Sequence, residues 1–258
     1  MTEESKKNDK LRLVIGWLYP KYMSTYGDRG NILTLWQRCR WRGIEVTVKE
    51  LDMGDKINPA YIDLYFFGGG QDQAQKIISN DLQTIKRGQL RKALRLGAVF
   101  LGICGGYQLF GHYYRPENEM DIPGIGILDV ITIAGNKRMI GNIAIEANEN
   151  LKLKDKKLIV GFENHSGKTY LGKRATPLGN VVVGYGNNGD DRTEGAYQGN
   201  VFGCYLHGPL LPKNPQFADL LIRRALERKY GTADLQKIDD TLELETQENV
   251  IERAKKIQ

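Results

Sequence analysis

Cysteine, histidine and proline are all scarce in this chain of 258 residues, which has three, three and eight of them. Three scattered cysteines are too few for a disulfide framework, and no cluster of His, Cys, Asp or Glu has metal-ligand spacing. No apolar run reaches the roughly 18 residues that span a membrane, and the polar first ten residues lack a signal-peptide core. These absences predict a cytoplasmic protein with reduced thiols and no metal site.

An excess of one charge is also missing, because 37 Lys and Arg against 31 Asp and Glu give a net charge of only +6. The densest basic run places Arg87, Arg91 and Arg95 four residues apart, on one face of a predicted helix. No RNA-reading signature or zinc-finger spacing accompanies this run. We interpret it as a solvated helix face and not as a nucleic-acid interface.

The first half of the chain alternates short apolar runs with amphipathic segments. Strands are predicted at 11–18, 44–48, 64–67 and 98–103, and helices at 31–41, 83–96 and 107–114. This alternation predicts an α/β fold, an open and mostly parallel twisted sheet flanked by helices.

The second half has strand-like runs with little helix between them, so some antiparallel pairing is expected there. The runs are 130–133, 140–145, 157–162, 181–185 and 201–205, followed by a predicted helix at 215–229. We divide the chain into a polar N-terminal extension at 1–10, one domain at 11–230 and a charged, helical tail at 231–258. The sequence leaves open whether this tail packs on the domain, moves freely or docks on a partner.

Glycine is abundant, with 30 residues, and the most specific local motif contains several of them. The segment 102–108, Gly-Ile-Cys-Gly-Gly-Tyr-Gln, follows a buried strand and opens a helix. This is the setting of a nucleophile elbow, in which small neighbours permit a strained turn and the helix N-terminus favours a thiolate. The pattern predicts Cys104 as a nucleophile, with the Gly105 N–H helping to hold an oxyanion. Cys39 and Cys204 are interpreted as core residues.

A thiolate nucleophile needs a proton donor for its leaving group, and only three histidines are available. His112 is too close to Cys104 in the sequence for good geometry. His207 follows a strand-like run, where open α/β sheets gather their sites, and is preferred over His165. The triple glycine 68–70 also follows a strand, and its N–H groups are candidates to complete the oxyanion hole.

Taken together, the motifs resemble those of class I glutamine amidotransferases of the cobyric-acid-synthase-like branch. The cysteine elbow, the triple glycine and His207 carry the general likeness. Four segments are similar to motifs of that branch: Tyr26 to Ile32, Arg138 to Asn142, Gly161 to His165 and Tyr205 to Pro209. Within the branch the chain resembles the glutamine-hydrolysing subunits of lipid II isoglutaminyl synthases, over about residues 11–230.

The resemblance implies a thiol glutaminase. Cys104 would attack the glutamine amide and His207 would protonate the departing ammonia. Gly69, Gly70 and Gly105 would form the oxyanion hole. Arg138 would bind the glutamine carboxylate, and Gln108 would also contact the substrate.

One position departs from the pattern of many class I amidotransferases, which place Glu two residues after the histidine. Here that residue is Pro209. The orienting carboxylate is then Asp28, Glu163 or a group of the partner subunit.

The chain shows no ATP-binding fingerprint, and only ten residues precede its first predicted strand. The resemblance therefore implies a separate Mur-ligase-like (MurT-like) synthetase subunit that carries ATP and Mg²⁺, while this chain needs no cofactor. The heterodimer would amidate the D-glutamate α-carboxylate of lipid II at the inner face of the cell membrane. The alternatives are an amidotransferase subunit for another, cobyrinate-like carboxylate and a catalytically silent scaffold of the same fold.

Overall fold

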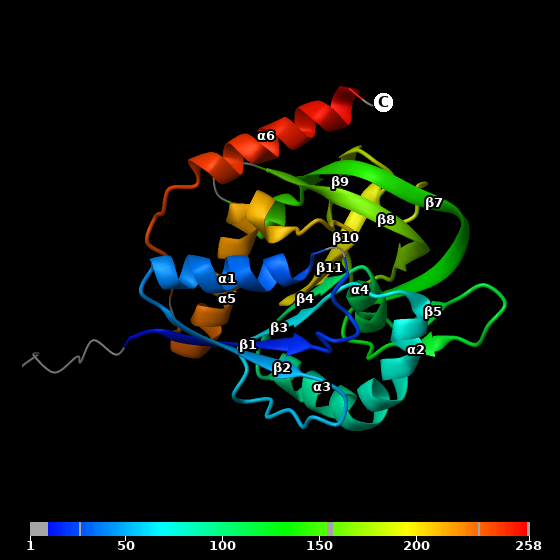
Figure 1. Cartoon of the computed structure of the whole chain (residues 1–258), viewed down its shortest axis with the longest axis horizontal. Helices are drawn as coiled ribbons and strands as arrows, with labels where there is room; N and C mark the ends of the chain where they lie inside the picture. The colour runs from blue at the N-terminus through cyan, green and yellow to red at the C-terminus, as the bar shows by residue number, and fades with distance from the viewer. Residues whose placement is uncertain (1–9, 26, 154–156, 232, 257–258) are drawn as a thin grey trace, which may run out of the picture.

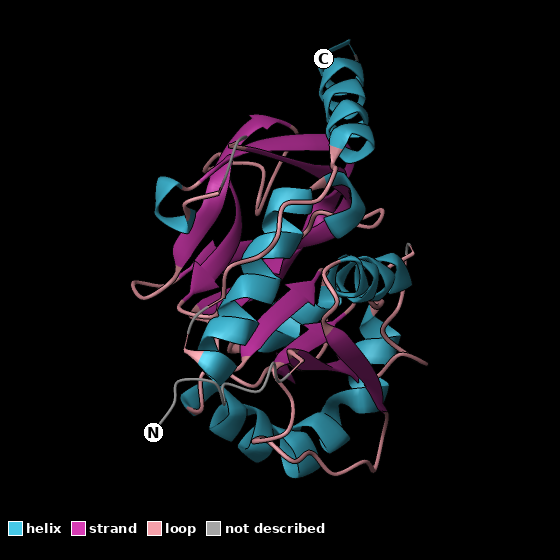
Figure 2. Cartoon of the chain, turned by 90° about the vertical axis from the view of Figure 1, so that its left-hand side faces the viewer, coloured by secondary structure: helices cyan, strands magenta, loops and turns pink. Residues whose placement is uncertain are grey.

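A computed structural model describes residues 10–25, 27–153, 157–231 and 233–256. The predicted N-terminal extension, apart from Lys10, and Tyr26 of the first branch motif lie outside these residues. The described strands join one mixed sheet, with neighbours in the order β2-β1-β3-β4-β11-β10-β9-β7-β5-β6 and β8 beside β7. Figure 1 shows the strands through the middle of the molecule, and Figure 2 shows helices on both sides of them.

The first half forms the parallel part of this sheet. Its strands are β1 (Arg12–Leu18), β2 (Glu45–Leu51), β3 (Leu64–Phe67) and β4 (Val99–Ile103). Its helical segments are α1 (Arg29–Trp41), α2 (Asp72–Asp81), the π-helical turn Leu82–Lys86, α3 (Arg87–Arg95) and α4 (Gly105–Phe110). β1 pairs in parallel with β2 and β3, and β4 pairs in parallel with β3 and with β11 (Val201–Cys204). The mostly parallel α/β architecture that the alternation predicts is confirmed here.

Two predicted helices differ from the structure. The helical run predicted at 83–96 begins eleven residues earlier, at Asp72, because α2, the π turn and α3 follow one another directly. The helix predicted at 107–114 ends at Phe110, where Gly111 adopts an extended conformation. The next residues form β5 (Tyr113–Arg115), which pairs with β7 (Val130–Ala147) and with β6 (Ile122–Pro123). Here the pairing of β5 with a strand distant in the sequence overrides the local helical pattern.

The second half contains the antiparallel pairs that its strand-rich pattern predicts. The predicted strands at 130–133 and 140–145 merge into β7, which pairs with β8 (Leu158–Leu171) across an irregularity between Ala134 and Met139. β9 (Thr176–Val183) pairs with β7 and with β10 (Thr193–Gln198), and β10 pairs with β11. The sequence analysis missed β10, whose Gly195 has a φ of +60° and whose other residues are mostly polar.

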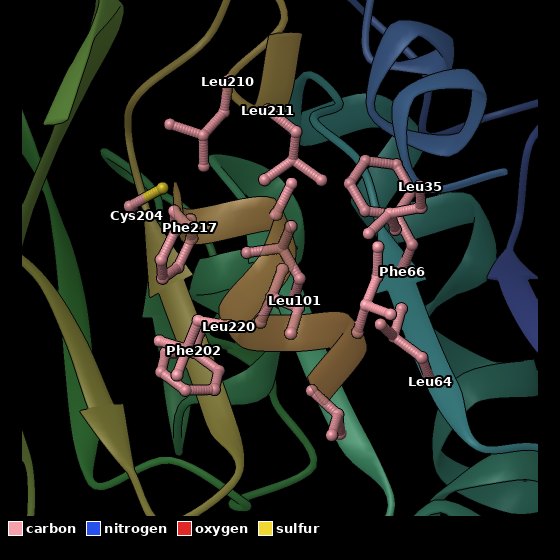
Figure 3. Packing of buried hydrophobic residues seen from close by; sticks show 14 of the residues in the cluster. Leu35, Leu64, Phe66, Leu101, Phe202, Cys204, Leu210, Leu211, Phe217 and Leu220 are labelled. Atoms are coloured by element: carbon pink, nitrogen blue, oxygen red, sulfur yellow. The ribbon is translucent and has the colours of Figure 1, made fainter. Parts of the chain in front are cut away.

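Successive residues of the central strands point to opposite faces and build two cores. Phe66, Leu101 and Phe202 pack on one face with Leu35 of α1 and Phe217 of α5 (Pro215–Tyr230), as Figure 3 shows. The other face buries a second set: Tyr65, Phe67, Phe100, Leu90 and Phe110. Strands buried on both faces explain the continuous apolar runs that the sequence shows.

The tail packs on the domain through α6 (Thr241–Lys256), which lies beside β7 and β8 in Figure 1. Arg38, 2% exposed, places Nε 2.8 Å from Asp219 Oδ1 and Nη1 2.5 Å from Asp240 Oδ1, at the start of the tail helix. The buried Gln247 donates to the carbonyl oxygens of Leu158 and Lys213. Among the helices that the structure describes, none is long and apolar enough to cross a membrane.

Candidate active site

Cys104 stands at the sharp turn between β4 and α4, with φ at 50° and ψ at −107°. This conformation is strained for a residue with a side chain. The glycines around it are required sterically, because a Cβ on Gly106 would lie 2.2 Å from Phe67 O. The Cys104 N–H donates to Cys204 O at 2.8 Å, and Cys104 O accepts from the Gln108 N–H at 2.9 Å. The turn is therefore fixed by the backbone on both sides of the cysteine.

His207 follows β11 and is fully buried beside this turn. Its backbone pairs with Phe162 of β8, and its side chain contacts both Cys104 and Asp28. Burial lowers the pKa of His207. Its electrostatic and hydrogen-bond interactions with Cys104 and Asp28 raise the pKa by a larger amount, so that the result is about 10. The arrangement favours the charged, imidazolium form of His207.

The two candidate orienting carboxylates lie in different places. Asp28, fully buried, has Oδ1 3.6 Å from His207 Nδ1. Glu163 instead accepts the N–H groups of Tyr185 and Gly186, at 2.7 and 2.9 Å. Its Oε2 lies 3.8 Å from Nε2 of His165, not beside His207. Of the two carboxylates, geometry favours Asp28 as the one that orients His207.

Asp28 precedes α1 at the N-cap position, where an aspartate usually caps its own helix. Here its side chain makes no cap hydrogen bond, and Oδ2 accepts the Gly69 N–H at 2.5 Å. The first turn of α1 packs on Pro209, the last residue of the histidine motif, since a Cβ on Gly30 would lie 2.4 Å from Pro209 Cγ. Two motifs far apart in the sequence thus meet, and the first brings a carboxylate to the position that Pro209 cannot serve.

The triple-glycine loop lies against the elbow, but its residues differ in what they can donate. The Gly69 N–H is bound to Asp28, so it is not the oxyanion donor that the resemblance implies. Gly69 instead gives space, because a Cβ there would lie 2.9 Å from His207 Cε1. Gly70 and Gly105 are adjacent, with 3.0 Å between Gly70 N and a Cβ built on Gly105. The Gly70 and Gly105 N–H groups therefore remain the candidate oxyanion donors.

A cavity of about 390 Å³ opens in front of Cys104 and is lined by Gln108, Arg138 and His165 among others. Arg138 lies on β7, near the β7–β8 irregularity, and its Nε donates to Asn164 Oδ1 at 2.6 Å. Gln108 donates from Nε2 to Tyr205 Oη at 3.2 Å and accepts from Gln75 at Oε1, at 2.7 Å. The cavity therefore joins the candidate nucleophile with both residues predicted to bind substrate.

His165 and His112 have other surroundings. The His165 ring stacks on Tyr205, with centroids 3.6 Å apart, and its Nδ1 lies 2.8 Å from Gly167 O. His112 pairs with Asp129, with 2.8 Å between Nε2 and Oδ1. The structure thus favours His207 as the histidine that serves Cys104. Within the described ranges, no group of three or more His, Cys, Asp or Glu side chains is arranged to hold a metal ion.

The sequence analysis missed three polar residues around the site. Asp72 and Gln75 line the cavity from α2, a helix that was not predicted. Glu194, fully buried on β10, accepts the Tyr205 N–H at 2.6 Å, and burial raises the pKa of its carboxyl group to about 8. A polar residue gives a usable signal only where its element is recognised, and neither α2 nor β10 was.

The chain is similar to several known proteins. The GatD subunit of lipid II isoglutaminyl synthase (glutamine-hydrolyzing) from Staphylococcus aureus is 39% identical, over 90% of this chain and 92% of its own length. The corresponding GatD subunit from Streptococcus pneumoniae is 41% identical, over 87% of this chain and 84% of its own. A probable cobyric acid synthase from Methanococcus vannielii is 33% identical, over 66% of this chain but 34% of its own length.

Solved structures show the same fold. PurLQS from Thermotoga maritima superposes with a TM-score of 0.58 at 17% identity, over 84% of this chain and 98% of that one. A glutamine amidotransferase from the same organism has a TM-score of 0.55 at 17% identity, over 95% and 94% of the two chains. The model of the CobB/CobQ-like glutamine amidotransferase domain matches residues 14–215, a range that includes Asp28, Cys104 and His207. The chain belongs to the CobB/CobQ-like glutamine amidotransferase family.

Proposed function

We propose that this chain is the glutamine-hydrolysing subunit of a lipid II isoglutaminyl synthase. The contact of Cys104 with the buried His207, at the end of one cavity, carries the glutaminase part of the proposal. The GatD subunits support lipid II as the acceptor of the ammonia, because they match this chain over most of both lengths. The cobyric acid synthase is a more distant relative, 33% identical over 66% of this chain, which makes the cobyrinate-like alternative the weaker one.

The chemistry begins with the Cys104 thiolate, which attacks the side-chain amide carbon of glutamine. The carbonyl oxygen becomes an oxyanion, held by the N–H groups of Gly70 and Gly105. As the tetrahedral intermediate collapses, the C–N bond breaks and the His207 imidazolium gives its proton to the leaving nitrogen, releasing ammonia. Water then attacks the thioester while neutral His207 takes a proton, and the C–S bond breaks to give glutamate and free Cys104.

Asp28 orients His207 and stabilises its charged form, as the third member of the catalytic group. Arg138, which lines the same cavity from β7, binds the α-carboxylate of glutamine. A guanidinium group can form two parallel hydrogen bonds with a carboxylate, and the contact with Asn164 holds Arg138 in place.

Ammonia released in the cavity becomes an amide only on an activated carboxylate, which calls for ATP. The partner is a Mur-ligase-like synthetase subunit that binds ATP and Mg²⁺ and activates the D-glutamate α-carboxylate of the lipid II stem peptide. The pair would then act at the cytoplasmic face of the membrane that carries lipid II.

The test is glutamate and ammonia release from L-glutamine by the purified chain, alone and with its ATP-dependent synthetase subunit. Cys104→Ala should reduce release at least about 10⁴-fold, because nucleophilic catalysis is lost. Cys39→Ala, a change at a buried thiol on α1, is the matched control and should retain release. Persistent release by Cys104→Ala would contradict the nucleophile. Normal release without amidated lipid II in the complex would contradict the acceptor.

A further inference from the structure

One face of α2 lines the cavity and is not used by the chemistry described above. Asp72 and Gln75 stand three residues apart, so they occupy neighbouring positions on the same side of the helix. Gln75 is 1% exposed, and Asp72 is half-buried at the start of α2. The two side chains add polar oxygen atoms to a cavity whose other charged side chain is Arg138 and whose floor is Cys104.

The orientation of the Gln75 amide is fixed by its neighbours. Its Nε2 donates to Gly70 O at 3.3 Å and to Gln108 Oε1 at 2.7 Å. Because a backbone carbonyl can only accept, the nitrogen must face Gly70 and the oxygen must face the other way. The Oε1 atom is buried and has no hydrogen-bond partner in the described part of the chain. A buried acceptor without a partner is costly, so this atom is suited to a donor that the ligand brings.

Gln108 extends this fixed arrangement into the protein. Its Nε2 donates to Tyr205 Oη, which lies 2.7 Å from Thr169 Oγ1. Thr169 Oγ1 is in turn 2.8 Å from Thr132 Oγ1. A buried chain of hydrogen bonds therefore prevents both amides from turning, and Gln75 presents Oε1 in one orientation.

Asp72 contributes the negative charge. Tyr114 Oη donates to Asp72 Oδ2 at 3.0 Å, and burial and the nearby carboxylate raise the pKa of Tyr114, so this phenol remains a donor. The same tyrosine is close enough to Cys104 to be affected by its charge. Among the residues that the structure describes, no Lys, Arg or His side chain forms an ion pair with Asp72.

The cavity is thus dipolar, with a guanidinium on the β7 side and a carboxylate with a lone amide oxygen on the α2 side. A free α-amino acid carries the complementary pair of charges. We propose that the Asp72 carboxylate and Gln75 Oε1 bind the α-ammonium group of the substrate and make the site specific for a free amino acid. This inference rests on the proposed glutaminase function and adds to it the residues that recognise the α-ammonium group of the substrate.

The experiment compares L-glutamine with glutaramate, which has the same amide and carboxylate but lacks the α-ammonium group. In the complex with the synthetase subunit, Asp72→Asn should lower kcat/KM for glutamine about 10- to 100-fold, as expected when a charged hydrogen bond is lost. The same variant should leave kcat/KM for glutaramate within about twofold of the wild type. Asparagine can still accept from Tyr114, so the fold around α2 is retained.

Glu119→Gln is the matched control, since it removes one negative charge beside α2, paired with Lys76, outside the cavity. It should change neither substrate's kcat/KM. Equal losses for glutamine and glutaramate in Asp72→Asn, or no loss for either, would overturn the proposal.

A binding arm separates this inference from the reaction. In the Cys104→Ala background, calorimetry should show L-glutamine binding more tightly than glutaramate, and Asp72→Asn should abolish the difference. If the protein binds L-glutamine selectively but the wild type releases no ammonia, the proposed glutaminase function is contradicted and the ammonium site is still supported. Equal affinity for both ligands in the Cys104→Ala protein would overturn the ammonium site itself.

Discussion

The two walls of the cavity are built differently. The inner wall presents Cys104 to the cavity and includes, behind it, the buried Asp28, Gly69 and His207. It is held by buried backbone and side-chain contacts at the ends of β3, β4 and β11. The outer wall, defined by Arg138 and Asn164, lies on β7 and β8, where the pairing is irregular and Arg138 is exposed. The inner wall is ordered for bond-making before substrate arrives, whereas the outer wall offers charge at an accessible edge.

This difference separates the expected kinetic effects. A change in the inner wall should lower the rate of the chemical step, because its contacts act on groups that gain and lose charge. A change in the outer wall should mainly weaken binding, because a carboxylate contact is similar in the ground state and the transition state.

Among variants that keep the nucleophile, the largest effect is expected from Asp28→Asn, in the inner wall. Removing the carboxylate should lower kcat for glutamine hydrolysis about 10²- to 10³-fold. Burial lowers the pKa of His207, while Cys104 and Asp28 raise it to about 10, so losing Asp28 should lower that pKa. The alkaline limb of the pH–kcat profile, where the imidazolium loses its proton, should then move to lower pH. A pH-dependent glutaminase assay measures both changes.

Glu163→Gln is the control for this carboxylate. Glu163 binds the N–H groups of Tyr185 and Gly186, so its replacement should lower stability but leave the alkaline limb unmoved. A shifted limb in Glu163→Gln together with an unshifted one in Asp28→Asn would reverse the assignment of the orienting carboxylate.

Arg138→Ala tests the outer wall. We expect KM for glutamine to rise about 10- to 100-fold with kcat within about threefold of the wild type, because one charged carboxylate contact is lost. Lys137→Ala removes a neighbouring positive charge that lies over the Tyr185 ring and does not line the cavity. It should leave KM unchanged. A loss confined to kcat in Arg138→Ala would place the arginine with the inner wall.

The smallest effect on the reaction is expected from Glu194→Gln, behind the inner wall. Burial raises the pKa of Glu194 to about 8, well above its unfolded value. The stability that depends on the protonated carboxyl is complete below the unfolded pKa and is lost as pH rises through about 8. The amide side chain of the Glu194→Gln variant does not titrate, so the variant escapes this loss. Its free energy of unfolding, measured relative to that of the wild type, should therefore rise by roughly 2–4 kcal/mol from pH 5 to pH 8.

Chemical denaturation at the two pH values measures this difference, and the glutaminase rate should change little. Parallel pH dependence of the wild type and Glu194→Gln would show that the buried carboxyl does not change protonation on unfolding in this range.

Local patterns were enough to predict much of the parallel half. The apolar run at 64–67 and the glycines around Cys104 place the elbow correctly, because strand burial and tight turns leave a direct composition signal. The antiparallel half was predicted less well. β10 is a polar, glycine-containing segment that pairs with β9 and β11. Its residues show no alternation of apolar and polar side chains that would predict a strand. The helix predicted beyond Phe110 was wrong for the same reason, since β5 exists through its pairing with β7.

The sequence by itself determined that a thiol lies at a strand-to-helix turn and that a histidine follows a late strand. Both follow from residue type and its immediate neighbours. Only the tertiary structure decided which carboxylate meets His207, which glycine N–H groups remain available, and which face of α2 lines the cavity. Those relations join Asp28, Gly69 and Gln75 to residues far away in the chain. They depend on how the sheet brings separate strand ends together, which no local pattern encodes.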